Sequence, residues 1–347
     1  MLSLILAAAL QTPQPGEVKE FDRWAVGCDN GRTCQAVSLL GHEDDDFPPI
    51  AIVRGPERWA RPTLILHGQS ERRCTSLAMF VDGRRLPQRL DLGCGHGRAK
   101  ALGEATEAFV AAVRVADRLE LKDTGGRVVG RFSLKGASAA LRYMDEKQHR
   151  AGTGTALVAV GTAPDSAVPP PPPLPVVKEV RPARPAKGRP LSARLADPWL
   201  TKHDCSRRDH LVAPSSYRLD DRQYLFFINC HFGSQDTWPL VLTARSPDGR
   251  GARPARFDYD SSINDAPGAS DAPVNADWDE AKGRLTSGWS GECGFIEEWV
   301  WDGEMFRLVE HSQMNSGTID RFSANCRADL PLWIPLWRAS VVPGGRR

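Results

Sequence analysis

The sequence predicts a mostly β protein with minor α content, built as two β-rich domains that a proline-rich linker joins. The eight cysteines divide four and four around the proline run 169–173, which indicates two separately cross-linked domains. Short runs of β-branched and aromatic residues fill both halves, and each ends at a glycine, a proline or an Asp-Gly turn. We therefore expect an N-terminal β-sandwich-like domain with two short helices and a C-terminal domain of antiparallel hairpins in a meander.

The N-terminal segment is predicted to be a signal peptide over residues 1–12. It is apolar and ends in small residues, and it is shorter than the roughly 20 apolar residues that cross a bilayer. The positively charged start of a signal is missing, which indicates either a start placed too late or a degenerate signal. A buried N-terminal strand is the alternative. The remaining boundaries place the first domain at 17–163, the linker at 164–198 and the second domain at 199–347. A signal and oxidised cysteines together predict a periplasmic or secreted protein without a transmembrane segment.

The first domain opens with a predicted hairpin. Trp24, Val26 and Cys28 alternate on one strand, the turn 29–31 has the sequence Asp-Asn-Gly, and Cys34 begins the return strand. Further strands are expected at 50–53, 63–66, 77–81, 119–121 and 128–132. Apolar residues at helical spacing predict helices at 104–115 and 137–148, and Gly152 is expected to close the second helix.

The linker and the second domain differ sharply in composition. Five consecutive prolines favour an extended, semi-rigid spacer that rises about 3.1 Å per residue. Eight of the ten tryptophans fall from Trp199 onward, which supplies large apolar side chains for the core of a β-domain. Hairpins without helices are expected, with strands at 224–228, 240–242, 274–278, 284–289, 296–301 and 305–309.

Disulfide bonds are the chemistry expected of the cysteines. No Cys-x-x-Cys occurs, so a zinc site would need scattered ligands. Four cysteines in one domain allow three pairings, and joining sequence neighbours is a choice among them. The chosen pairs are Cys28 with Cys34, Cys74 with Cys94, Cys205 with Cys230, and Cys293 with Cys326.

Side chains that could carry chemistry are few. His203, Asp204 and His210 could bind a metal or move protons, but a polar loop beside a disulfide explains them equally well. Glycine-rich phosphate loops are absent, so no cofactor is expected. The net charge of +2 and the lack of long basic runs argue against a nucleic-acid partner.

Three tryptophans of the second domain, Trp289, Trp299 and Trp301, are a candidate ligand platform. On a strand, Trp299 and Trp301 would point to one face and Val300 to the other. The paired rings could then stack on a sugar or a peptide. Packing in the core is the alternative that small β-domains favour.

The stretch 133–157 begins Ser-Leu-Lys-Gly and continues into a polar motif. Together with the opening 24–30 and the late 299–303, it resembles domain of unknown function family 1176, exported proteobacterial proteins. His149 stands where that family usually has glycine, which puts a tight backbone approach there in doubt. The residues that match the family motif are Asp145, Gln148, Arg150, Gly152, Thr153 and Thr155.

The first half is also similar to the invasion-associated locus B family. That resemblance implies a sandwich-like fold and an envelope setting, and neither family implies catalytic residues. We expect an exported, non-catalytic cell-envelope protein that binds an envelope protein or a glycan. A periplasmic hydrolase that uses His and Asp residues of the second domain is the alternative, and the sequence leaves the oligomeric state open.

Overall fold

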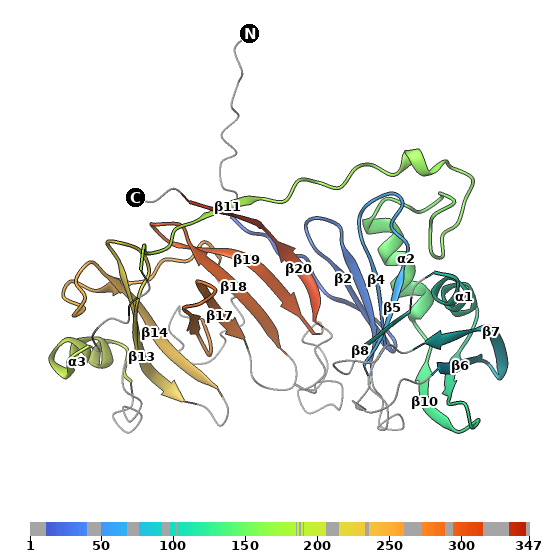
Figure 1. Ribbon diagram of the computed structural model, residues 1–347, viewed down its shortest axis with the longest axis horizontal. Coiled ribbons are helices and arrows are strands. Elements are labelled where there is room, and N and C mark those ends of the chain that lie inside the picture. Colours follow the sequence, from blue (N-terminus) through green and yellow to red (C-terminus); the bar gives the residue numbers. More distant parts are fainter. Residues whose placement is uncertain are drawn as a thin grey trace, which may run out of the picture.

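The computed structural model has a mostly β fold (Figure 1). Most of the predicted signal peptide lies outside the described residues. In the part of the chain that the structure describes, no helix has the length and apolar content that crossing a bilayer requires. The structure describes residues 12–39, 50–67, 76–91, 98–101, 103–184, 186, 189, 191–205, 215–232, 236–259, 273–288, 294–314 and 333–344.

The first module, from β1 to α2, contains two antiparallel sheets. The larger has the order β1-β2-β3-β4-β5-β8 and the smaller the order β10-β9-β6-β7. The predicted strands of this half are confirmed, and Cys28 lies opposite Cys34 in the first hairpin. The strands are β1 Lys19–Phe21, β2 Trp24–Cys28, β3 Cys34–Ser38, β4 Ile50–Arg54, β5 Thr63–His67, β6 Ser76–Val81, β7 Arg84–Asp91, β8 Arg98–Ala101, β9 Arg118–Lys122 and β10 Val128–Ser133.

Both sheets share one hydrophobic core with two helices, α1 (Glu104–Val113) and α2 (Ala137–Lys147). Each helix presents an apolar stripe to this core, because its buried residues recur every three to four positions. Gly136, with φ 86°, precedes α2. A Cβ there would lie 1.7 Å from the Phe21 carbonyl oxygen, so only glycine allows α2 to lie this close to β1.

The second module, from β11 to β21, is layered. Helix α3 covers one face of the sheet β12-β13-β14-β15, whose other face packs on the sheet β16-β17-β18-β19-β20. The parallel pair β11–β21 covers the outer face of that second sheet. The elements are β11 Val176–Glu179, α3 Ala193–Lys202, β12 Ser216–Arg218, β13 Tyr224–Phe232, β14 Thr237–Ala244, β15 Arg253–Pro254, β16 Asp277–Asp279, β17 Arg284–Gly288, β18 Phe295–Trp301, β19 Phe306–Gln313, β20 Ile334–Arg338 and β21 Ser340–Pro343.

The segment 164–198 differs from the expected spacer. It supplies β11, which pairs in parallel with β21, and it contains the start of α3, although no helix was predicted in this half. Leu195 and Trp199, four residues apart, pack against the β13–β14 core. This packing outweighs the cost of Pro198 inside the helix. In Figure 1 the proline tract runs along the top of the molecule from the first module to β11.

The two modules pack directly on each other through β20 (Figure 1). Ile334 and Leu336 of β20 lie against Ala25, Val37 and Ala51, which point out of the large sheet on the face opposite its own core. Trp337 points the other way, into the core of the second module. Strand β20 therefore supplies side chains both to the interface between the modules and to the core of the second module.

We expect Gly27→Ala to wedge the modules apart. A Cβ at Gly27 would lie 2.7 Å from Ile334 Cγ2 and 2.8 Å from Leu336 Cδ2, and overpacking of this kind costs about 1–3 kcal/mol. Urea unfolding measures the loss. Gly154→Ala is the matched control, because its Cβ would meet nothing closer than 3.7 Å. Equal stability of the two variants would contradict the interface.

Candidate functional site: a buried polar network

Five of the six residues of the family motif lie in a buried polar network with Arg54, and the sixth, Gly152, is exposed in the loop after α2. Arg54 ends β4, Asp145 and Gln148 lie at the end of α2, and Arg150 and Thr153 follow in the next loop. All five are almost inaccessible, with exposures of 2% or less. Thr155 completes the set at the edge, with its hydroxyl 3.0 Å from that of Thr153. We call these six residues the polar network.

A buried ion pair forms the centre of the polar network. Arg54 Nη2 donates to Asp145 Oδ1 at 2.8 Å, Nε donates to Gln148 Oε1 at 2.6 Å, and Nη1 donates to the Thr155 carbonyl at 3.0 Å. Asp145 also accepts the backbone N–H groups of residues 157–159 at 2.7–3.1 Å. Burial lowers the pKa of Arg54 to about 10, so this side chain is charged at neutral pH.

The buried Gln148 side chain bonds the backbone of two surface turns. Its amide nitrogen lies 2.9 Å from the carbonyl oxygen of Arg32, in the turn between β2 and β3. The same nitrogen lies 3.0 and 3.1 Å from the carbonyl oxygens of Arg54 and Gly55, where the β4–β5 loop begins. One side chain thereby fixes the distance between the two turns.

Arg150 supports the loop that joins β4 to β5. Its guanidinium donates to the carbonyl oxygens of Glu57 and, at 2.9 Å, Arg58, and it reaches the Thr155 hydroxyl at 3.2 Å. We call residues 55–62 the Trp59 loop, because Trp59 is 73% exposed at its tip. The buried guanidinium therefore holds the backbone of a loop that presents a large aromatic side chain to solvent.

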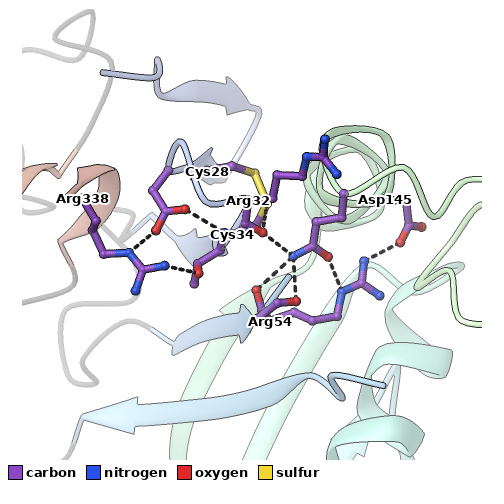
Figure 2. The surroundings of a disulfide bond; sticks show 10 residues. Cys28, Arg32, Cys34, Arg54, Asp145 and Arg338 are labelled. Atoms are coloured by element: carbon purple, nitrogen blue, oxygen red, sulfur yellow. Dashed lines mark hydrogen bonds and ion pairs between the residues drawn. A yellow bond between two sulfur atoms is a disulfide. The ribbon is translucent and has the colours of Figure 1, made fainter. Parts of the chain in front are cut away.

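The turn 29–33, which the Cys28–Cys34 disulfide closes, connects the polar network to the second module (Figure 2). Arg338 of β20 donates to the Asp29 carboxylate and, at 2.6 Å, to the Thr33 hydroxyl. The Asn30 side chain bonds both the N–H and the carbonyl of Arg338. Hydrogen bonds thus run without a break from α2, through the disulfide turn, to the C-terminal strands.

The predicted disulfides are confirmed where the structure describes them. Cys28 is bonded to Cys34 and Cys205 to Cys230, with Cα–Cα distances of 4.1 and 4.6 Å. Cys74, Cys94, Cys293 and Cys326 lie outside the described residues, as do Trp289 and His210.

Trp299 and Trp301 lie in the core rather than on a ligand platform. Their exposures are 1% and 2%, and the Trp301 indole donates to Asp220 Oδ2 at 2.7 Å. Both rings belong to the cluster between the two sheets, while Val300 packs against β11. The predicted alternation is therefore confirmed, and core packing explains the two rings.

The structure places His203 and Asp204 at the end of α3. The His203 ring stacks on Trp199 with the ring centres 6.2 Å apart. Asp204 is exposed and adopts a left-handed backbone with φ 51°. In the part of the chain that the structure describes, no three His, Cys, Asp or Glu side chains come together as a metal site.

Sequence reasoning missed a buried Glu–His pair in the second module. His311 Nδ1 lies 2.9 Å from Glu297 Oε1, with residue exposures of 3% and 0%. The rings of Phe295 and Tyr259 pack on His311. The alternation of inward and outward residues along β18 could have revealed this pair, because Glu297 occupies an inward position between Phe295 and Trp299. With aromatic rings packed against it and exposures near zero, this pair is part of the interior of the second module.

We expect Asp145→Asn to destabilise the fold by about 3–5 kcal/mol. The substitution leaves Arg54 as an uncompensated buried charge and points an N–H₂ group at backbone N–H donors. Chemical unfolding measures the loss. Glu146→Gln, on the exposed neighbouring residue, serves as the control and should change stability by less than about 0.5 kcal/mol. A tolerated Asp145→Asn would show that the ion pair does not support the fold.

His149→Gly should stabilise the protein by about 0.5–1 kcal/mol. Helix α2 ends at Lys147, before the predicted Gly152, and His149 adopts a left-handed backbone with φ 54°. That conformation is strained for a residue with a Cβ and suits glycine. The His149 side chain is exposed, so little contact is lost. Thermal unfolding tests this, and His149→Ala should give no gain, because alanine keeps the Cβ.

Known proteins show where this chain belongs. The uncharacterized protein YpfG of Escherichia coli K12 is 29% identical over an alignment of 224 residues, which covers 59% of this chain and 60% of that protein. The solved structure of invasion associated protein B from Bartonella henselae covers 38% of this chain and 98% of its own, with a TM-score of 0.29 and 15% identity, values too low to support an argument. The family described as protein of unknown function (DUF1176) matches residues 18–331, far more than half of the sequence, and the chain therefore belongs to that family.

Proposed function

We propose that this chain is an exported, non-catalytic interaction protein of the cell envelope. One observation carries the proposal: the buried motif residues bond the backbone of a loop whose tip residue, Trp59, stands in solvent. Side chains with exposures near zero do not contact a substrate. Their bonds fix the shape of the surface loop above them, and a loop of fixed shape with an exposed aromatic tip suits binding.

The described cysteines support the extracytoplasmic setting. Both described pairs are oxidised, one within each module. Such bonds form and persist in the periplasm and outside the cell, and they are rare where thiols are kept reduced. The partner classes that fit this setting are an envelope protein and an envelope glycan.

Rigidity supports a binding role. The modules share the apolar surface at β20, the disulfide turn bonds Arg338, and β11 joins β21. A surface that is already ordered before binding loses less conformational entropy on association. The buried bonds therefore favour recognition by surface loops that keep their shape.

Expression of the full sequence in Escherichia coli tests the compartment and the activity together. The protein should be recovered in the periplasmic fraction, and alkylation without reductant should add no mass to its cysteines. Incubated with peptidoglycan fragments, it should release no new products by mass spectrometry. On immobilised envelope extract it should be retained saturably.

New cleavage products that disappear in His203→Ala or Asp204→Ala would establish the hydrolase alternative instead. Free thiols in the exported protein would remove the argument for the compartment. Glu146→Gln is the control in each assay, because the residue is exposed and lies outside the polar network.

A further inference from the structure

The Trp59 loop is unusual among the described surfaces because its tip is a largely exposed tryptophan. Trp59 is 73% exposed, and the other exposed large apolar side chains of the described residues are valines, at 115, 160 and 176. Tryptophan and arginine are the residues most enriched among binding hot spots. Arg58 and Arg61 flank Trp59 closely in the same loop.

The loop is ordered before any partner arrives. Arg150 bonds the carbonyl oxygens of Glu57 and Arg58, and Gln148 bonds that of Gly55. The Ala60 N–H closes a turn onto the Glu57 carbonyl at 2.7 Å. Since these bonds fix the backbone of the Trp59 loop, little conformational entropy is lost when a partner binds its tip.

Two arginine side chains flank Trp59, and both are accessible to a partner. Arg58 is exposed and forms no ion pair with any residue that the structure describes. Arg61 pairs with Glu107 of α1, yet its side chain is 72% exposed. A partner that brings carboxylates to this edge would therefore find one free guanidinium and a second that is loosely held.

The shape of the loop selects among possible partners. It joins two adjacent antiparallel strands, β4 and β5, and so projects from the end of the sheet. Glycans and small ligands bind in concave sites lined by several groups, which a projecting tip is not. Binding to a membrane surface scales with buried apolar area, and a single tryptophan supplies little. A projecting aromatic anchor suits insertion into a pocket of another protein.

We propose that Trp59 and Arg58 anchor a protein partner that offers an apolar pocket rimmed by carboxylates. This inference rests on the proposed binding function and names the class of partner and the residues that contact it. Trp59 fills the pocket, and Arg58 pairs with an acidic side chain at its rim.

Photo-crosslinking from the loop tests the anchor in the full-length protein. A benzoylphenylalanine replaces Trp59 in one variant and the exposed Val176 of β11 in a matched control. In periplasmic extract, the residue-59 probe should crosslink one protein that the residue-176 probe does not. Arg58→Glu should abolish that crosslink, whereas Arg58→Lys should keep it.

The crosslinked protein, purified and titrated with the unlabelled chain, gives the quantitative test. Trp59→Ala should weaken binding at least 30-fold, the loss that defines a hot spot, while Trp59→Phe keeps part of the affinity. Arg58→Glu should lower the association rate and its dependence on salt. Unchanged melting temperatures for these variants exclude a folding defect.

Other outcomes overturn the inference. A crosslink at residue 59 only to lipid or to peptidoglycan would show a different partner class, and equal crosslinking at residue 176 would show that the loop is not the anchor. If the wild-type protein is retained on envelope extract and Trp59→Ala is retained equally, the anchor fails while the proposed function stands. If neither is retained, the proposed function fails as well.

Discussion

The polar network and the Trp59 loop above it depend on one interaction, the buried ion pair of Arg54 and Asp145. Each charge loses several kcal/mol of hydration on burial, and only close pairing with further hydrogen bonds compensates that loss. Asp145 meets this condition with three backbone N–H groups, and Arg54 meets it with Gln148 and the Thr155 carbonyl. The loop after α2 must therefore fold back over the helix end. This folding in turn places Arg150 beneath the β4–β5 loop.

The same end of the large sheet also couples the two modules. Gln148 bonds the Arg32 carbonyl in the disulfide turn, and the other side of that turn bonds Arg338. A displacement of the turn would change both sets of bonds at once. The apolar contact at β20 strengthens this coupling, since Leu336 packs on the first module while Trp337 packs on the second. The protein is therefore one mechanical unit with two cores.

Much of the fold could be predicted from the sequence, because alternation and turn residues are local signals. The opposite orientations of Val300 and Trp301 follow from a period of two. Helix α3 was missed because proline composition concealed the spacing of Leu195 and Trp199. The roles of the motif residues could not be predicted, since Asp145 pairs with an arginine 91 residues away. Trp59 carried no strand or helix signal, and only the structure shows its exposure.

The support of the Trp59 loop does not depend on the side chains that the loop displays. Gln148 and Arg150 bond the main-chain oxygens of Gly55, Glu57 and Arg58, and every amino acid has such an oxygen. Substitutions at the tip therefore leave the supporting bonds intact, while a substitution in the polar network alters the shape of the whole loop. The polar network fixes where a contact is made, and the residues at the tip of the loop determine what is contacted. This separation lets one buried motif present different binding surfaces.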